Sequence, residues 1–384
     1  MKTTLTTLGI FLLVLAGCAG QKQAESNFIQ ENIDNAVAQE TIQTDIIEKS
    51  GKILNPRTID KDGNIVYVPI DDWCSGFFPG NIWHMYELTG DQKWLPLAEK
   101  YTEDLDSVQY LTWHHDVGFM IGSSYLNGYR FAGKEEYKPV IIQTAKSLST
   151  RFRPAAGVLQ SWDADKGWQA ERGWKCPVII DNMMNLELLY FASKVTGDPH
   201  YAEIANSHAI TTAREQFRED YSNYHVVNYD PETGKVLHKQ TCQGKNDDSS
   251  WARGQAWAIY GYTMAYRETK KPEFLEMAQH TAEFWLNHSN LPEDMVPYWD
   301  FNAGQEGYVP EWEYDANDFK EIPRDASAAA ITASALLELY QYVDKKTGKR
   351  YYQAAVKTLK SLASPSYLAT QGTNGNFLLK HCVG

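Results

Sequence analysis

One plan recurs five times along the chain, and this recurrence restricts the possible folds more than any other feature. In each copy a helical stretch ends, a short turn follows, and an aromatic residue opens the next helical stretch. The five aromatic residues are Trp94, Tyr137, Tyr201, Phe274 and Tyr352. Glycines stand where the end of a helix favours a positive φ, at Gly90, Gly133, Gly197 and Gly348. The plan predicts repeated hairpins of two helices, joined by loops of unequal length.

The helical stretches fall into two classes. Segments such as "MMNLELLYFASKV", "GQAWAIYGYTMAY" and "ASAAAITASALLELYQYV" are apolar on most sides, so we predict that they are buried. The recurring segments between them carry Lys and Glu at intervals and should form an outer layer. This alternation predicts an all-α fold, an (α/α)6 barrel of six hairpins, with an open helical solenoid as the alternative. Residues 27–384 contain no linker rich in Pro, Gly or Ser, so we expect them to form a single catalytic domain.

The N-terminal segment differs from the rest of the chain. A basic residue at position 2 precedes an apolar run over residues 8–15, and "LAGC" follows, with its cysteine at position 18. The run is too short to span a membrane, and the order resembles a bacterial lipoprotein signal. We therefore predict a signal peptide over residues 1–17, lipidation of Cys18 and a short tether over residues 18–26. The expected product is an exported lipoprotein, anchored to a membrane in the periplasm or at the outer membrane or cell surface; an ordinary secretory signal is the alternative.

Charge and aromatic content restrict the class of ligand. The chain has 49 acidic and 36 basic residues and a net charge of −13. A nucleic-acid partner is therefore not expected, because binding to phosphates needs a basic surface. The chain also has 12 Trp, 23 Tyr and 14 Phe. These residues fill a large core or line a groove for sugars, whose rings present apolar C–H faces that stack on indoles.

Acidic or hydroxyl residues precede each of the apolar helical stretches, for example in "TWHHDVGFM", "VIIDNMMN" and "EIPRDASAAA". Taken singly, each fits a helix N-cap. In a barrel the inner helices are parallel, so their N-termini should meet at one mouth, where helix dipoles favour anions. The side chains expected at this mouth are Trp73, Trp113, His115, Asp116, Asp181, Trp251, Arg253 and Asp325. Carboxylates beside aromatic residues and an arginine indicate a sugar-hydrolysing site.

A metal site is the competing interpretation of the adjacent His114, His115 and Asp116. Neighbouring side chains on a forming helix diverge by about 100° per residue, so the two histidines cannot easily bind one ion. The sequence has no HExxH or EF-hand pattern and no CxxC pair. We therefore expect neither a metal nor another cofactor.

Several long motifs, in order, resemble one enzyme family. They are "WCSGFFPGNIWHMYELTGD", "HHDVGFM", "IIDNMMN", "YHVVNYDPETG" and "QGKNDDSSWARGQAWAIYGY". From about Asp71 to Gly384 the chain is similar to the unsaturated glucuronyl hydrolases, glycoside hydrolase family 88. The resemblance implies an (α/α)6 barrel and an exo-acting hydrolase. Its substrate would be the 4,5-unsaturated uronic acid at the non-reducing end of lyase-generated oligosaccharides, removed by protonation and hydration of the C4=C5 vinyl ether.

The resemblance also implies roles for individual residues. The aspartate of "IIDNMMN", Asp181, corresponds to the general acid and base, and the aspartate of "HHDVGFM", Asp116, to the second essential carboxylate. The substrate-binding positions correspond to His115, His225, Thr241, Gln243, Trp251, Arg253 and Trp257. Arg253 fits the substrate carboxylate, because a guanidinium can donate two parallel hydrogen bonds to it.

Two other functions are weighed against this one. An unsaturated rhamnogalacturonyl hydrolase would share the barrel, and a lipid-anchored glycan-binding protein would explain Cys18 and the tryptophans. The acidic residues repeated at helix starts favour a hydrolase over a binding protein. Family members usually continue past "GNFLLKH" through a serine- and glycine-containing loop into a final helix, whereas this sequence ends at Gly384. We therefore expect the barrel to lack its last inner helix in this chain.

Overall fold

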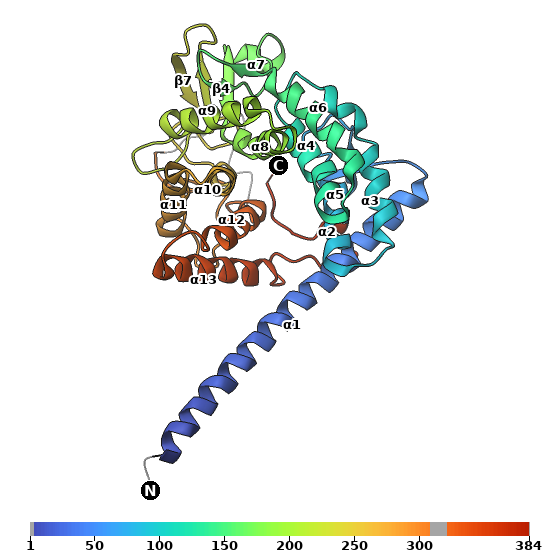
Figure 1. Ribbon diagram of the computed structural model, residues 1–384, viewed down its shortest axis with the longest axis vertical. Helices are drawn as coiled ribbons and strands as arrows, with labels where there is room; N and C mark the ends of the chain where they lie inside the picture. The colour runs from blue at the N-terminus through green and yellow to red at the C-terminus, as the bar shows by residue number, and fades with distance from the viewer. Residues whose placement is uncertain (1–3, 308–320, 384) are drawn as a thin grey trace.

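The computed structural model describes residues 4–307 and 321–383, with side chains from residue 23 onward. In these ranges five consecutive helical hairpins follow a long first helix, α1 (Thr4–Ser50) (Figure 1). The inner helices are α2 (Phe77–Thr89), α4 (Val117–Ser123) with α5 (Tyr125–Ala132), α8 (Leu186–Thr196), α10 (Ala252–Thr269) and α12 (Ala326–Leu339). The outer helices are α3 (Trp94–Glu103), α6 (Lys138–Ser149), α9 (Pro199–Glu215), α11 (Pro272–Asn287) and α13 (Lys345–Leu362). Short 3₁₀ helices are η1 (Asp106–Tyr110), η2 (Glu135–Tyr137), η3 (Ile180–Asn185) and η5 (Asn374–Asn376).

The inner helices follow one another around a ring in sequence order. α2 packs against α4, α4 against α8, α8 against α10, and α10 against α12. The C-terminal segment passes from α13 toward α1 and α2 and ends near the centre of the ring (Figure 1). The backbone N–H of Ala326 donates to the carbonyl of His381 (2.9 Å), and the N–H of Gly372 donates to the side chain of Gln39 in α1 (2.9 Å). The fold is therefore the predicted (α/α)6 barrel and not an open solenoid. Five hairpins and α1 are present, and between α13 and residue 383 the only helix is the short η5, as expected for a barrel without its last inner helix.

Three of the predicted turns end helices as expected. Gly90, Gly133 and Gly197 have φ of 66°, 67° and 73° and end α2, α5 and α8. Glycine adopts this left-handed conformation without the steric cost that a Cβ imposes. Asp198 begins α9, because its side chain accepts a hydrogen bond from the N–H two residues later.

The prediction for the last hairpin is wrong in two respects. Gly348 does not end a helix: it lies in the first turn of α13, which Asp344 caps. A Cβ at Gly348 would meet the carbonyl oxygen of Tyr340 at 2.6 Å, so the glycine serves close packing. The aromatic residue that anchors this helix in the core is Tyr351, whereas the predicted Tyr352 is 37% exposed.

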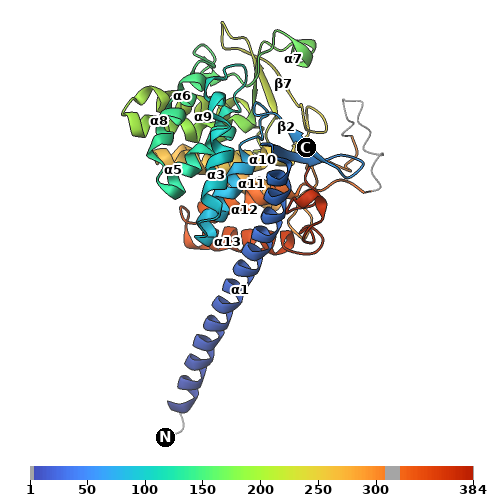
Figure 2. The ribbon, with the colours of Figure 1, turned by 90° about the vertical axis from the view of Figure 1, so that its right-hand side faces the viewer.

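Short antiparallel sheets, which the sequence did not predict, connect some of the helices. β1 (Asn55–Ile59) pairs with β2 (Ile65–Val68), and β3 (Phe152–Arg153) pairs with β4 (Val158–Leu159). A three-stranded sheet has the order β5 (Cys176–Ile179), β6 (Val226–Tyr229), β7 (Val236–Gln240). These strands are too short to show a clear period of two, so their apolar runs resemble the approach to a buried helix. Figure 2 shows β2, β7 and the short helix α7 (Gly167–Glu171) on one side of the helical ring.

Helix α1 projects from the ring (Figures 1 and 2) and runs without a break from residue 4 to residue 50. It includes residues 18–26, which were predicted to form a tether; Gln, Lys, Ala and Glu in this stretch favour a helix. The side chain of Cys18 lies outside the described residues. At the other end, Glu48 accepts hydrogen bonds from Lys100 (2.7 Å) and Tyr101 (2.6 Å) of α3. In the described part of the chain, no helix combines the length and the apolar character needed to cross a membrane.

Candidate active site

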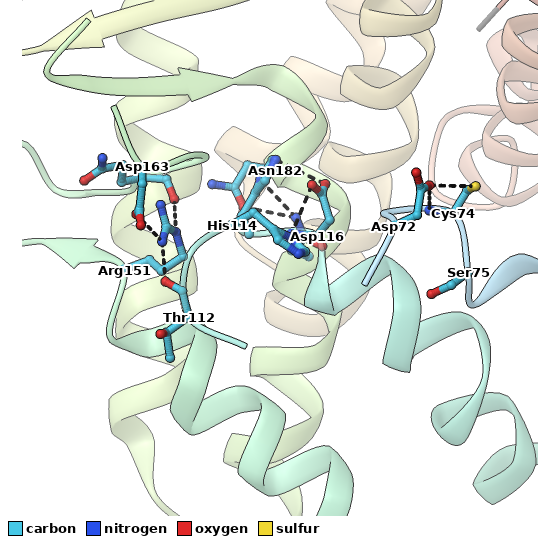
Figure 3. A network of polar contacts seen from close by, with 12 residues as sticks. Asp72, Cys74, Ser75, Thr112, His114, Asp116, Arg151, Asp163 and Asn182 are labelled. Atoms are coloured by element: carbon cyan, nitrogen blue, oxygen red, sulfur yellow. Dashed lines mark hydrogen bonds and ion pairs between the residues drawn. The ribbon is translucent and has the colours of Figure 1, made fainter. Parts of the chain in front are cut away.

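The loop before α4 presents Asp116 close to His114 (Figure 3) and to His115. Nε2 of His115 lies 3.2 Å from Oδ1 of Asp116, and Nδ1 of His114 lies 3.4 Å from Oδ2. Nδ1 of His114 also accepts a hydrogen bond from the backbone N–H of Asp116 (3.0 Å), which fixes the ring. On the other side of His115, Nδ1 faces Nδ2 of Asn185 at 3.2 Å. An amide nitrogen only donates, so Nδ1 is the acceptor and Nε2 carries the proton that faces Asp116.

The surroundings of Asp116 keep its carboxylate ionised. Burial alone would raise the pKa of Asp116, but His115, His114 and Arg151 together outweigh burial and hold the pKa below its ordinary value. Burial lowers the pKa of His115, and the charge of Asp116 opposes this effect only in part. The pair is therefore a neutral imidazole that faces a carboxylate.

Arg151, at the end of α6, ties this loop to the neighbouring strands. Its side chain is buried and donates hydrogen bonds to the carbonyls of Thr112 and of Gln160, the latter at 2.7 Å. It also pairs with Asp163 at 3.0 Å (Figure 3). Arg151, which precedes β3, thus holds the loop that carries Asp116 against Gln160 and Asp163, which follow β4.

Asp181 stands where strand β5 passes into the 3₁₀ helix η3. β5 pairs with β6 in a register that sets Ile179 opposite Val226. The next residue, Ile180, donates its N–H to the carbonyl of His225 at 3.1 Å. The strand register therefore brings His225 beside Asp181, although 44 positions separate them in the sequence.

The contacts of His225 determine which of its nitrogens is protonated. Its Nδ1 accepts hydrogen bonds from the backbone N–H groups of Cys242 (3.1 Å) and Gln243 (3.0 Å). Nε2 therefore carries the proton, and it lies 3.5 Å from Oδ2 of Asp181. The ring also packs against Trp251, with 4.5 Å between the ring centroids. His225 thus presents a fixed N–H to the carboxyl group of Asp181.

Two asparagines of η3, Asn182 and Asn185, lie between the segments that carry the two aspartates. Asn185 contacts His115 as described above, and its Nδ2 lies 3.3 Å from Oδ1 of Asn182. Asn182 in turn donates to the carbonyl of Leu159 (2.8 Å). Gly118 of α4 makes this packing possible, because a Cβ there would meet the Cβ of Asn185 at 2.7 Å. The segments that carry the two aspartates are therefore in direct contact.

Arg253 lies in the first turn of α10, and part of its guanidinium already binds other groups of the protein. Its NH1 donates to Oδ2 of Asp325 (2.9 Å) and to the carbonyl of Val383, and its guanidinium lies 4.5 Å from the ring centroid of Trp251. Its Nε is buried and finds no hydrogen-bond partner among the described residues. Asp325 also caps α12 by accepting from two backbone N–H groups. At this position the N-cap interpretation is correct, and Asp325 is the partner of Arg253 rather than a free carboxylate.

The remaining predicted residues form the walls around this centre. Thr241 is buried, and its hydroxyl accepts a hydrogen bond from the N–H of Gly244 (2.7 Å). Trp257 is buried, with its ring centroid 5.2 Å from that of Phe119. The same aromatic group includes Trp73, Phe77, Trp251 and Trp299. Trp113 is 47% exposed and packs on His114 with 4.1 Å between the centroids.

A pocket of about 860 Å³ opens beside these walls. Gln243, Trp251 and residues 381–383 contribute to its lining. Ligand pockets typically measure about 300–1,000 Å³, so the volume fits a small oligosaccharide. Neither Asp116 nor Asp181 is among the lining residues; His225, which contacts both Gln243 and Trp251, lies between the pocket and Asp181.

The two adjacent histidines approach different oxygens of Asp116, as the divergence of neighbouring side chains predicts. Within residues 23–307 and 321–383, no group of three or more His, Cys, Asp or Glu side chains is arranged to hold a metal ion.

Comparison with known proteins identifies the family. Residues 57–383 match the profile of Glycosyl Hydrolase Family 88. The chain belongs to glycoside hydrolase family 88. It is 46% identical to an unsaturated glucuronyl hydrolase of Formosa agariphila over 331 residues, which cover 86% of this chain and 78% of the relative. It is 31% identical to an unsaturated chondroitin disaccharide hydrolase of Streptococcus pyogenes, over 92% of this chain and 84% of the relative.

Solved structures agree with this family 88 assignment. An unsaturated glucuronyl hydrolase specific for heparin superposes with a TM-score of 0.83 at 42% identity, covering 93% of this chain and 90% of the other. An aspartate-to-asparagine variant of the Streptococcus agalactiae enzyme, complexed with dGlcA-GalNAc6S, superposes with a TM-score of 0.71 at 28% identity, covering 93% and 84%. The family 88 protein is therefore a glycoside hydrolase, and the interpretation as a non-enzymatic glycan-binding protein is set aside.

The sequence analysis missed three residues that hold the family 88 site together. Asn182 and Asn185 could have been found in the sequence. They are two amides three positions apart in the apolar run "IIDNMMNLELL", and buried amides need hydrogen-bond partners. Arg151 could not have been found in this way, because "STRFRP" has two arginines and only the fold shows which of them is buried.

Proposed function

We propose that this family 88 hydrolase removes a 4,5-unsaturated uronic acid from the non-reducing end of oligosaccharides made by polysaccharide lyases. The observation that carries the proposal is the contrast between two carboxyl groups. Asp116 is held ionised by two histidines and Arg151. Asp181 is 9% exposed, and its Oδ2 faces the N–H of His225 and accepts no hydrogen bond from the described part of the chain. Two carboxyl groups in different environments suit two different roles in one reaction.

In the proposed first step, Asp181 acts as the general acid. Its carboxyl proton goes to C4 of the unsaturated sugar, and the π electrons of the C4=C5 bond form the new C4–H bond. Positive charge then develops at C5 and at the ring oxygen. The ionised carboxylate of Asp116 stabilises this charge electrostatically, in a site where burial strengthens the interaction.

In the proposed second step, the carboxylate of Asp181 acts as the base. A water molecule adds to C5 and gives one proton to Asp181, which restores the acid. The resulting hemiketal opens to a ketone at C5, and the hemiacetal left at C1 releases the remaining sugar chain as an alcohol. The net change is the addition of one water, with no covalent enzyme intermediate.

The binding residues are assigned to the substrate as follows. The free Nε edge of Arg253 binds the carboxylate of the unsaturated sugar, since NH1 is held by Asp325. The sugar rings lie against the walls formed by His115, His225, Thr241, Gln243, Trp251 and Trp257. Support comes from the relatives, one named for chondroitin disaccharide, one described as specific for heparin and one complexed with dGlcA-GalNAc6S.

The test is a panel of lyase-generated disaccharides incubated with the enzyme. The conjugated C=C–carboxylate absorbs in the ultraviolet, and the proposed hydration removes this absorbance as the second sugar is released. The matched saturated disaccharides should not be cleaved. Cleavage of saturated and unsaturated disaccharides at similar rates would contradict the proposal, because an ordinary glycosidase does not need the double bond.

We also infer that the enzyme is exported and anchored through its N-terminus. The support is the order of a basic residue, an apolar run and "LAGC" in the sequence, which fits a signal over residues 1–17 and lipidation at Cys18. Residues 27–384 would then act as the catalytic domain outside the cytoplasm. Expression in a bacterium should give a membrane-bound product whose N-terminal peptide carries lipid by mass spectrometry. A Cys18→Ser product that is retained and lipidated to the same extent would contradict the inference.

A further inference from the structure

Three tryptophans form a compact group around the short helix α7. The ring centroids of Trp162 and Trp168 are 5.3 Å apart, those of Trp168 and Trp174 are 5.5 Å apart, and those of Trp162 and Trp174 are 6.0 Å apart. Trp174 is buried, whereas Trp168 is 44% exposed. The rings of Trp162 and Trp174 thus support the indole of Trp168, which faces solvent on α7.

This tryptophan group is continuous with the candidate active site. The ring of Trp162 lies edge-on to His115, with 6.2 Å between the centroids, and its backbone pairs with that of His114. On the other side, Trp162 and Trp174 pack in one apolar cluster with Cys242, which lines the pocket. The group therefore extends from the Asp116 side of the site to the wall of the pocket.

The exposed indole is held in place by contacts beneath it. Nε1 of Trp174 donates to the side chain of Gln240 in β7 (2.7 Å). Arg172 lies 5.1 Å from the ring centroid of Trp174 and donates to the carbonyl of Thr241 (3.2 Å). α7 and β7 lie on the same side of the ring in Figure 2. A rigid indole exposed in this way binds an apolar face with little loss of conformational freedom.

We propose that Trp168 forms a subsite for a pyranose ring beyond the first leaving sugar, so that the enzyme favours unsaturated oligosaccharides longer than disaccharides. The inference rests on the proposed function. Trp168 is one ring farther from His115 than Trp162 is, so its ligand is the ring after the one nearest to the reacting centre. A pyranose ring suits this position, because its C–H face is apolar and its hydroxyl groups at the rim stay in water.

The kinetic test compares an unsaturated disaccharide with the corresponding unsaturated tetrasaccharide. For Trp168→Ala, the ratio of kcat/KM for the tetrasaccharide to that for the disaccharide should fall about fivefold, which corresponds to about 1 kcal/mol of lost ring contact. Trp168→Phe keeps a ring and should lose less. Tyr340→Ala removes an exposed aromatic residue at the far end of α12 and should leave the ratio unchanged. An unchanged ratio for Trp168→Ala would overturn the proposal.

A binding measurement separates this proposal from the proposed function. The two unsaturated oligosaccharides are titrated calorimetrically into Asp181→Asn and into Asp181→Asn combined with Trp168→Ala. Tighter binding of the tetrasaccharide than of the disaccharide, lost on removal of Trp168, supports the subsite even if the wild-type enzyme leaves the double bond intact. Equal affinities for the two ligands, with or without Trp168, overturn the subsite even if the wild-type enzyme cleaves both.

Discussion

Replacing Asp325 by asparagine should destabilise the enzyme by about 3 kcal/mol, because Arg253 would be left buried without a charged partner. The two side chains lie 2.9 Å apart, and Asp325 is fully buried while Arg253 is 4% exposed. Asp325 has a second role, since its Oδ1 accepts the hydrogen bonds that cap α12. Asparagine has one oxygen, so it can keep the cap or the contact with Arg253 but not both.

The magnitude follows from these separate roles. Removing one member of a buried ion pair costs about 3–5 kcal/mol. The low end applies here, because Arg253 keeps the carbonyl of Val383 and the face of Trp251. Asp325→Ala also loses the cap, which is worth about 1 kcal/mol, so its total should be about 4 kcal/mol. Both values are large against the total stability of about 5–15 kcal/mol that is typical of native proteins.

The assay is equilibrium unfolding in urea at neutral pH, followed by far-ultraviolet circular dichroism. Asp344 provides a matched control, because it caps α13 through two backbone N–H groups in the same way and pairs with no arginine in the part of the chain that the structure describes. Asp344→Asn should leave the free energy of unfolding nearly unchanged, since asparagine is as good a cap as aspartate. If Asp325→Asn costs no more than Asp344→Asn, the buried pair is not a significant source of stability and the reasoning fails.

Three further predictions concern the site and helix α1. Arg253→Lys should raise KM at least about tenfold, as about 1.4 kcal/mol of lost contact would, because a single ammonium cannot replace the guanidinium fork; steady-state rates that match wild type would remove Arg253 from the site. Asn185→Leu leaves Nδ1 of His115 unpaired and should lower kcat roughly tenfold to a hundredfold by displacing the ring, with little change in KM; an unaltered kcat would show that Asn185 does not position His115. Burial raises the pKa of Glu40 in α1 from its ordinary value of 4.5 to about 8, so between these pH values the folded state holds a proton that the unfolded state releases. The free energy of unfolding should therefore fall as pH rises between these values, by up to about 1.4 kcal/mol per pH unit. Glu40→Gln should abolish this slope in urea unfolding measured from pH 5 to pH 8, and a slope equal to that of wild type would contradict the assignment.

Local signals in the sequence predicted the barrel well. Each inner helix is apolar on most sides, and each hairpin turn depends on a few neighbouring residues, such as Gly90 with its left-handed φ and Asp198 at the start of α9. These features act within one helical turn, so a single sequence displays them. Gly348 misled the prediction because a glycine kept for close approach to Tyr340 resembles a glycine at a helix end.

The site was predictable in its residue types but not in its contacts. Asp181 and His225 meet through the register of β5 and β6, and that register depends on strands far apart in the sequence. Asn185 contacts His115 across 70 positions, and Arg253 pairs with Asp325 across 72. The residues near either partner in the sequence do not indicate such a pair. The ion pair between Arg253 and Asp325 is therefore seen only in the folded structure.

The central claim is that Asp181 delivers the proton to the substrate, and Asp181→Asn tests it most directly. Asparagine keeps the shape and most hydrogen bonds but has no carboxyl proton to donate to carbon. The measurement is kcat on an unsaturated disaccharide, with calorimetric binding and urea unfolding of the same variant as controls. General acid–base catalysis contributes typically about 10²–10⁴-fold, so we predict a kcat at least about a hundredfold below wild type, with binding and stability nearly unchanged. A well-folded Asp181→Asn enzyme with a kcat close to that of wild type would contradict the account.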